Sequence, residues 1–147
     1  MAGDLSGPIL FKLLCAFLLG GVIGLERELR EKPAGLRTNM FICIGATLYT
    51  ILSFEMARRY GGDPVRIAAQ LIPGIGFIGA GAILRERGGV VGITTAATIF
   101  VNASVGMAIG AGLYFTAAAT AGLALFVLWA VGRVERWIGK HKKQNDV

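Results

Sequence analysis

Apolar residues occur along this chain in five long stretches, separated by short segments that hold nearly all of the charge. A helix of roughly 17 or more apolar residues is long enough to cross a hydrocarbon core about 30 Å thick. The pattern therefore predicts an all-α membrane protein, a bundle of about five transmembrane helices at residues 8–25, 38–54, 65–84, 90–109 and 113–131.

The third stretch, residues 65–84, contains the glycine pattern Gly74-Ile75-Gly76-Phe77-Ile78-Gly79. This G-x-G-x-x-G spacing also occurs in dinucleotide-binding proteins, where it follows a strand and opens a helix. Here it lies deep inside an apolar run that is typical of a helix from Pro64 onward, so close packing of another helix is the favoured interpretation. We also expect Pro73 to kink this helix.

Glycine is abundant, with 22 residues, and several glycines are spaced so that they share one face of a helix. Small residues at such positions allow two helix backbones to approach closely. We assign eight of them to helix packing: Gly20, Gly24, Gly74, Gly76, Gly79, Gly81, Gly106 and Gly110.

Polar residues inside the stretches recur at four-residue steps, which places them on one face of each helix. In a bilayer such a face turns inward, where hydroxyl and amide groups find partners. The second stretch has Asn39, Cys43 and Thr47 at this spacing, and the fourth has Thr94, Thr98 and Asn102 with Thr95 alongside.

The net charge of +6 comes from 15 basic and 9 acidic residues. No nucleic-acid-binding motif accompanies this charge, so we expect no nucleic-acid partner. Basic residues mark the cytoplasmic loops of membrane proteins, and most of them share one side if the amino terminus is outside. That side would hold Arg27, Arg30, Lys32, Arg37, Arg85, Arg87, Arg133, Arg136, Lys140, Lys142 and Lys143.

We therefore predict an outer amino terminus and a cytoplasmic carboxyl terminus, with a transmembrane domain over residues 1–132 and a basic cytoplasmic tail over residues 133–147. Lys12 is expected to extend toward the outer headgroups. After the first span the helix should continue, with the opposite-charge pairs Glu26–Arg30 and Arg27–Glu31.

The charged and polar residues suggest a functional cluster at two levels of the bundle. We expect Glu26, Arg27, Arg37 and Arg85 to form an inner polar belt, with Arg66 and Gln70 facing Asn102 or Thr47 from the other side. The alternative is that these groups are interfacial charges and interhelical hydrogen bonds with a structural role only. The full candidate cluster is Glu26, Arg27, Arg37, Asn39, Arg66, Gln70, Arg85, Thr94, Thr95, Thr98 and Asn102.

Other chemistry has little support in the sequence. The single histidine, His141, lies in the tail, and neither Ser53 nor Ser104 has a base nearby in sequence, so no enzyme and no cofactor are expected. Cys15 and Cys43 lie in apolar stretches, as small core residues do. Mg²⁺ prefers carboxylates and water, and the mid-membrane positions offer no Asp or Glu.

Several segments, in order, resemble the MgtC/SapB family: Gly24-Leu25-Glu26-Arg27-Glu28, Ala34-Gly35-Leu36-Arg37-Thr38-Asn39, Arg66-Ile67-Ala68-Ala69-Gln70, the glycine pattern from Gly74 to Gly81, and Gly92-Ile93-Thr94-Thr95-Ala96-Ala97-Thr98. The resemblance covers roughly residues 18 to 132. It implies a multi-pass protein of the bacterial inner membrane.

The resemblance further implies a link to growth in low magnesium and to survival inside macrophages. Members of the family are thought to act on other membrane proteins, including inhibition of the proton-driven ATP synthase. Many have an ACT-like soluble domain after the last span, where this sequence has only a short tail, so a regulatory role that needs that domain does not transfer.

Two functions from different classes follow. The first is a modulator of other membrane proteins, linked to magnesium homeostasis or stress adaptation, whose partners are the lipid bilayer, a membrane complex such as the ATP synthase, and further copies of itself. The second is an Mg²⁺ transporter or channel subunit that acts as an oligomer, with hydroxyls and carbonyls around a central path.

Overall fold

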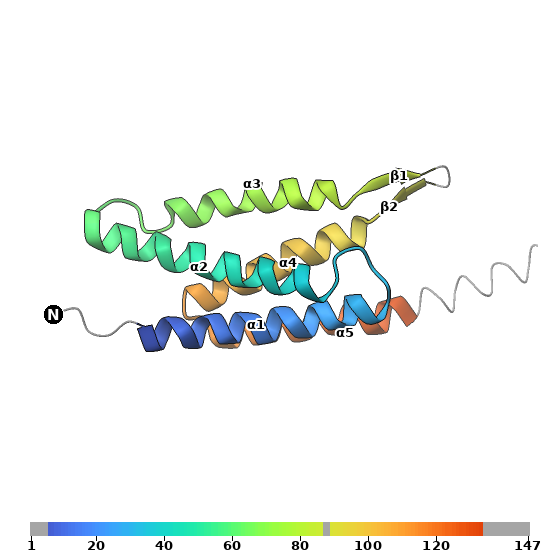
Figure 1. Cartoon of the computed structure of the whole chain (residues 1–147), viewed down its shortest axis with the longest axis horizontal. Coiled ribbons are helices and arrows are strands. Elements are labelled where there is room, and N and C mark those ends of the chain that lie inside the picture. The colour runs from blue at the N-terminus through green and yellow to red at the C-terminus, as the bar shows by residue number, and fades with distance from the viewer. Residues whose placement is uncertain (1–5, 87–88, 134–147) are drawn as a thin grey trace, which may run out of the picture.

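The computed structural model describes residues 6–86 and 89–133. Within them lie five α-helices, shown in Figure 1, and α5 continues as a π-helical turn, η1. A two-stranded antiparallel hairpin joins α3 to α4. The elements are α1 (Ser6–Leu29), α2 (Leu36–Tyr60), α3 (Arg66–Gly81), β1 (Leu84–Glu86), β2 (Gly89–Val91), α4 (Ile93–Gly110), α5 (Tyr114–Phe126) and η1 (Val127–Val131).

Four helical segments in the described part of the chain are long and apolar enough to cross a membrane: Pro8–Leu29, Leu36–Tyr60, Ile93–Gly110 and Tyr114–Val131. The prediction of an all-α membrane bundle is confirmed. Successive helices run in alternating directions, so α1 begins at one end of the bundle and η1 ends at the other (Figure 1). Which end faces the cytoplasm stays a prediction, and residues 134–147 of the tail lie outside the described residues.

The third helix is shorter than its apolar stretch. We expected a span over residues 65–84, but α3 covers only Arg66–Gly81, 16 residues or about 24 Å of helix. Glycines weaken the end of this helix, and the β-branched pair Val90-Val91 favours a strand, so the chain leaves α3 for the hairpin. The fourth helix correspondingly begins at Ile93, because Gly92 adopts a left-handed φ of 92°.

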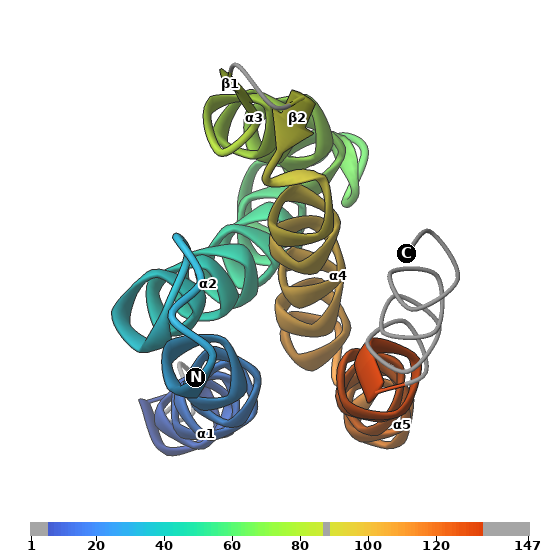
Figure 2. The same ribbon diagram turned by 90° about the vertical axis from the view of Figure 1, so that its right-hand side faces the viewer.

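The bundle is organised around α2, which packs against α1, α3 and α4. Figure 2, an end view, shows α3 at the edge of the assembly beside α2 and α4, and α5 at the opposite edge beside α4. Two buried clusters fill the interior. One includes Ile23, Cys43 and Val105, and the other includes Ile42 and Ile99.

Four of the eight predicted packing glycines lie where helices meet. A Cβ added at Gly20 would lie 2.7 Å from Cys43 Cβ, and one at Gly24 would lie 2.8 Å from Leu36 Cα. On α4, a Cβ at Gly106 would lie 2.8 Å from Ala46 Cβ. One at Gly110 would lie 2.6 Å from Thr50 Cβ. No side chain fits at these positions without moving the helices apart.

The glycines of α3 behave differently. Gly79 is near α4, with Ala96 Cβ 3.6 Å from the position of an added Cβ. Gly74, Gly76 and Gly81 have no atom within 4 Å of such a Cβ, so the prediction that they pack another helix fails within a single chain. Because α3 lies at the edge of the bundle, its outer face has no neighbouring helix in the described chain.

Two side chains satisfy the ends of helices in ways that the sequence did not indicate. Lys12 Nζ donates to Gly110 O at 2.7 Å, so it binds the last turn of α4 and does not extend to the headgroups as predicted. A cation there complements the helix dipole and its unpaired carbonyls. Ser53 Oγ on α2 accepts from the N–H groups of Ile67 and Ala68, both at 3.2 Å, and so caps α3.

We predict that Gly106→Ala lowers the free energy of unfolding by about 1–3 kcal/mol, because its Cβ would overlap the backbone of α2 at Cys43. Gly122→Ala is the matched control, since a Cβ at Gly122 on α5 meets no atom within 4 Å. Unfolding in detergent, followed by tryptophan fluorescence, measures both. Equal stability of the two variants would contradict the close approach of α2 and α4.

Candidate functional site

A buried pair of asparagines joins the first turn of α2 to the middle of α4. Asn102 Nδ2 donates to Asn39 O at 2.7 Å and to Asn39 Oδ1 at 3.1 Å. Asn39 Nδ2 in turn donates to Ala34 O at 2.8 Å and to Gly35 O at 2.9 Å. Both asparagine side chains are fully buried. The pair therefore fixes α4 against α2 and also holds the turn that precedes α2.

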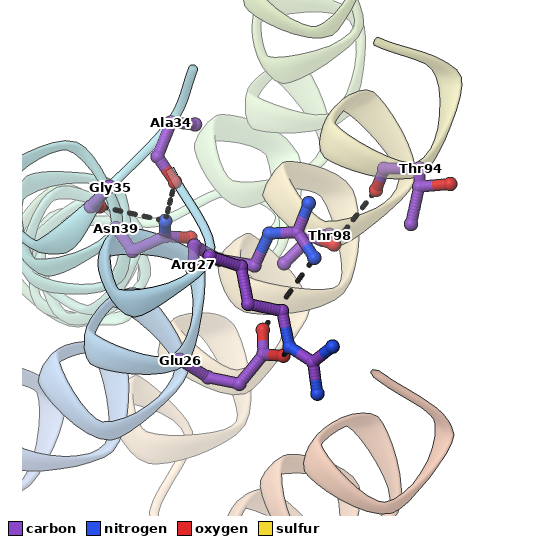
Figure 3. A network of polar contacts seen from close by, with 8 residues as sticks. Glu26, Arg27, Ala34, Gly35, Asn39, Thr94 and Thr98 are labelled. Carbon is purple, nitrogen blue, oxygen red and sulfur yellow. Dashed lines mark hydrogen bonds and ion pairs between the residues drawn. The ribbon is translucent and has the colours of Figure 1, made fainter. Parts of the chain in front are cut away.

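Threonines in the same helices mostly bond to backbone carbonyls. Thr47 Oγ1 donates across the interface to Gly106 O at 2.8 Å, while Thr98 Oγ1 donates within its own helix to Thr94 O at 2.8 Å (Figure 3). Thr95 is buried, and Thr94 is exposed at the start of α4. The inward-facing polar stripes that the sequence predicted are present except at Thr94, and Thr47 links α2 to α4.

A charged cluster lies at the end of α1. Arg27 is 4% exposed, and its Nη1 lies 3.5 Å from Glu26 Oε2. Glu26 also forms an ion pair with Arg30, one turn further along, as the sequence predicted. The other predicted pair, Arg27–Glu31, is absent from the described ion pairs because α1 ends at Leu29, and Glu31 takes a left-handed φ of 54°.

The turn between α1 and α2 uses a carboxylate that sequence reasoning missed. Glu28 Oε2 accepts from Leu36 N at 2.9 Å, so it caps the amino end of α2. Gly35 lies beside it, and an added Cβ there would overlap this carboxylate and displace it from its capping position. The signal was present in the sequence as Glu28 close to Gly35, but only the reversal of the chain brings the two together.

The predicted residues do not form one cluster. Arg66 and Gln70 are exposed on α3, whereas the hydrogen bonds of Asn102 and Thr47 go to other groups of α2 and α4. Arg37 is exposed at the start of α2. Arg85 belongs to β1, and its side chain lies outside the described part of the structure. The structure brings together Glu26 with Arg27, and Asn39 with Asn102.

Gln70 instead lines a groove between α2 and α3 that has a volume of about 510 Å³. Glycine and alanine line it from both helices, at Gly45, Ala46 and Gly74, and two aromatic side chains, Phe41 and Tyr49, also contribute. Gln70 is the polar side chain among mainly apolar neighbours. An amide exposed on an apolar helix favours a partner with which it can hydrogen-bond.

The MgtC family model matches residues 13–137, which is most of the chain. The chain belongs to the MgtC family. The family resemblance stated from the motifs is therefore confirmed. With its membrane-spanning helices, the chain is a multi-pass protein of the bacterial inner membrane.

Three curated relatives illustrate the similarity. YhiD of Escherichia coli, named as a candidate magnesium transporter, is 45% identical over 116 residues, which are 75% of this chain and 54% of YhiD. SapB of Bacillus subtilis is 46% identical over 130 residues, 84% of this chain and 55% of SapB. MgtC of Brucella abortus is 49% identical over 105 residues, 70% of this chain and 42% of MgtC.

The chain thus spans about half the length of the curated relatives that it matches. No solved structure matches it significantly.

We predict that Asn102→Ala lowers the free energy of unfolding by about 1–3 kcal/mol, because it removes two interhelical hydrogen bonds and leaves Asn39 acceptors buried. Thr98→Ala is the control and should lower it by less, since the hydrogen bond that it loses lies within α4. Denaturant titration in micelles compares them. Greater destabilisation by Thr98→Ala would show that the asparagine pair does not hold the interface.

Proposed function

We propose that this chain is an inner-membrane modulator that binds other membrane proteins, with a role in magnesium homeostasis or stress adaptation. The observation that supports it most is the groove between α2 and α3, which is apolar, has small residues from both helices, and presents one amide. A transmembrane helix of a partner fits this description, because small residues permit close backbone approach and Gln70 offers a hydrogen bond.

The position of α3 supports the same proposal. Among the described elements α3 packs mainly against α2 and α4, which leaves its outer face open to contact with other proteins. Its glycines Gly74, Gly76 and Gly81 are open on their Cβ side. Phe77, which is 84% exposed, lies among them as an apolar side chain that a partner helix would cover.

The magnesium role is inferred from the family. YhiD is named as a candidate magnesium transporter, and it shares 45% identity with this chain. That name also favours the second candidate, an Mg²⁺ transporter or channel subunit that acts as an oligomer. Against direct transport, the buried polar side chains of α2 and α4 are amides and hydroxyls, whereas Mg²⁺ prefers carboxylates and water.

We predict that Gly45→Leu abolishes complementation by this chain of a strain that lacks its gene, grown in low magnesium. The leucine would fill the groove, while a Cβ at Gly45 meets no atom within 4 Å, so the fold should persist. With a photo-crosslinker placed at position 70, the yield of the crosslinked partner should fall about tenfold in this variant, because the leucine overpacks the contact.

Gly122→Leu is the matched control for this experiment. Gly122 is equally open but lies on α5, away from the groove, so growth and crosslinking should match the wild type. Normal growth and crosslinking with Gly45→Leu, at wild-type protein levels, would overturn the groove as the docking site.

Transport and modulation are separated with purified protein in liposomes that enclose a magnesium-sensitive dye. If the chain is a modulator, an inward Mg²⁺ gradient should give no more signal than in empty liposomes. Flux that rises in proportion to the amount of protein would favour the transporter and contradict our proposal.

A further inference from the structure

A second cavity, of about 1050 Å³, lies at the end of the bundle where α1 ends and α4 begins. Its walls come from the turn after α1, from β2 and the first turn of α4, and from η1. None of its lining residues belongs to the groove between α2 and α3. Its polar lining consists of Arg27, Arg30, Glu31, Lys32, Thr94 and Thr95.

Arg27 is the unusual member of this lining. Its side chain is 4% exposed, and its Nε is buried without a hydrogen-bond partner in the described part of the chain. A guanidinium has five N–H donors, and leaving a buried one unpaired is costly. Figure 3 shows its side chain extending toward α4. The Nε donor therefore lacks an acceptor among the described residues.

Glu26 lies beside Arg27 but leaves its Nε unpaired. Its carboxylate is shared, since it contacts Arg30 closely while the distance to Arg27 Nη1 is 3.5 Å. That separation is too long for a good hydrogen bond. The lining itself contributes three basic side chains and one carboxylate, Glu31, so the cavity is electropositive.

The start of α4 supplies further donors. The first helical hydrogen bond runs from Ala96 N to Gly92 O, so the N–H groups of Ile93, Thr94 and Thr95 precede the helical ladder. No side chain in the described part of the chain caps this end. The backbone at Gly92 is left-handed, and an added Cβ would overlap Ala82 O, so only glycine fits there. Such an uncapped helix end attracts anions.

We propose that this cavity binds a phosphate group, held by the guanidinium of Arg27 and by the free N–H groups at the start of α4. A phosphate offers several acceptor oxygens, which suits a planar guanidinium beside a row of N–H donors. Free phosphate and the headgroup of an anionic lipid share this chemistry. The apolar walls at Val127, Leu128 and Val131 leave room for the lipid's hydrophobic part.

The test uses the full chain, delipidated in neutral detergent, and measures its thermal unfolding. Phosphatidylglycerol is compared with phosphatidylcholine in mixed micelles, and sodium phosphate is compared with sodium chloride at equal ionic strength. Stabilisation by phosphatidylglycerol alone identifies a lipid headgroup, and stabilisation by both identifies a site for phosphate in general. Stabilisation by sodium phosphate alone identifies the free ion.

Variants locate the site. Arg27→Gln should raise the concentration that gives half of the stabilisation about tenfold, as loss of a charged hydrogen bond implies. Arg27→Lys keeps the charge but not the planar guanidinium, so its half-stabilising concentration should lie between those of the wild type and Arg27→Gln. This variant tests the site if Arg27→Gln does not fold. Arg59→Gln removes the same charge from an exposed position on α2 and should bind like the wild type.

Two results would overturn the proposal. In the first, phosphatidylglycerol stabilises the wild-type chain no more than phosphatidylcholine does, and sodium phosphate stabilises it no more than sodium chloride does. In the second, Arg27→Gln and Arg59→Gln weaken the stabilisation equally, which would indicate that the ligand is attracted to the overall charge of the chain. The wild-type comparison decides the matter even if no variant at Arg27 folds.

Discussion

The close contact between α2 and α4 is the constraint on which the rest of the bundle depends. In a bilayer, apolar side chains gain little by leaving lipid for protein, so helix association relies on tight packing and hydrogen bonds. Both operate here, through Gly106 and Gly110 at the backbone and through Asn39 and Asn102 in the interior. Because Asn39 also bonds to Ala34 and Gly35, the same contact positions the turn from α1. The charged end of α1 is thereby held beside the start of α4.

Two regions remain open once this framework has formed, and they differ in chemistry. The groove between α2 and α3 is apolar with a single amide, as expected for contact with another helix in the membrane. The cavity at the end of α1 is basic and includes an uncapped helix start, as expected for contact with an anion. On our two proposals, the groove would receive a protein partner and the cavity a phosphate group. The groove and the cavity are lined by different residues, so a substitution in one changes no residue that lines the other.

Much of the candidate site could be predicted residue by residue, but its assembly could not. Four-residue spacing correctly placed Asn39 and Asn102 on inward faces, because helix periodicity is a local property. The proposed proximity of Arg66 and Gln70 to Asn102 required knowledge of which helices are neighbours. Both residues are exposed on α3, and Gln70 lines the groove between α2 and α3. Lys12 and Ser53 were missed as helix caps for the same reason. Their partners, Gly110 and the start of α3, are distant in sequence or follow a turn whose path is not encoded locally.

The sequence by itself determined that lipid surrounds most of the chain and that the fold is a bundle of helices. Apolar stretches long enough to cross a bilayer must satisfy their backbone polar groups internally, and helices do so without reference to the rest of the chain. Motif order was likewise sufficient to place the chain in its family. Only the tertiary structure decided where α3 ends, which glycines meet a neighbouring backbone, and that Arg27 is buried beside an uncapped helix. These properties depend on distances between segments far apart in sequence, and such distances are set by packing of the whole bundle.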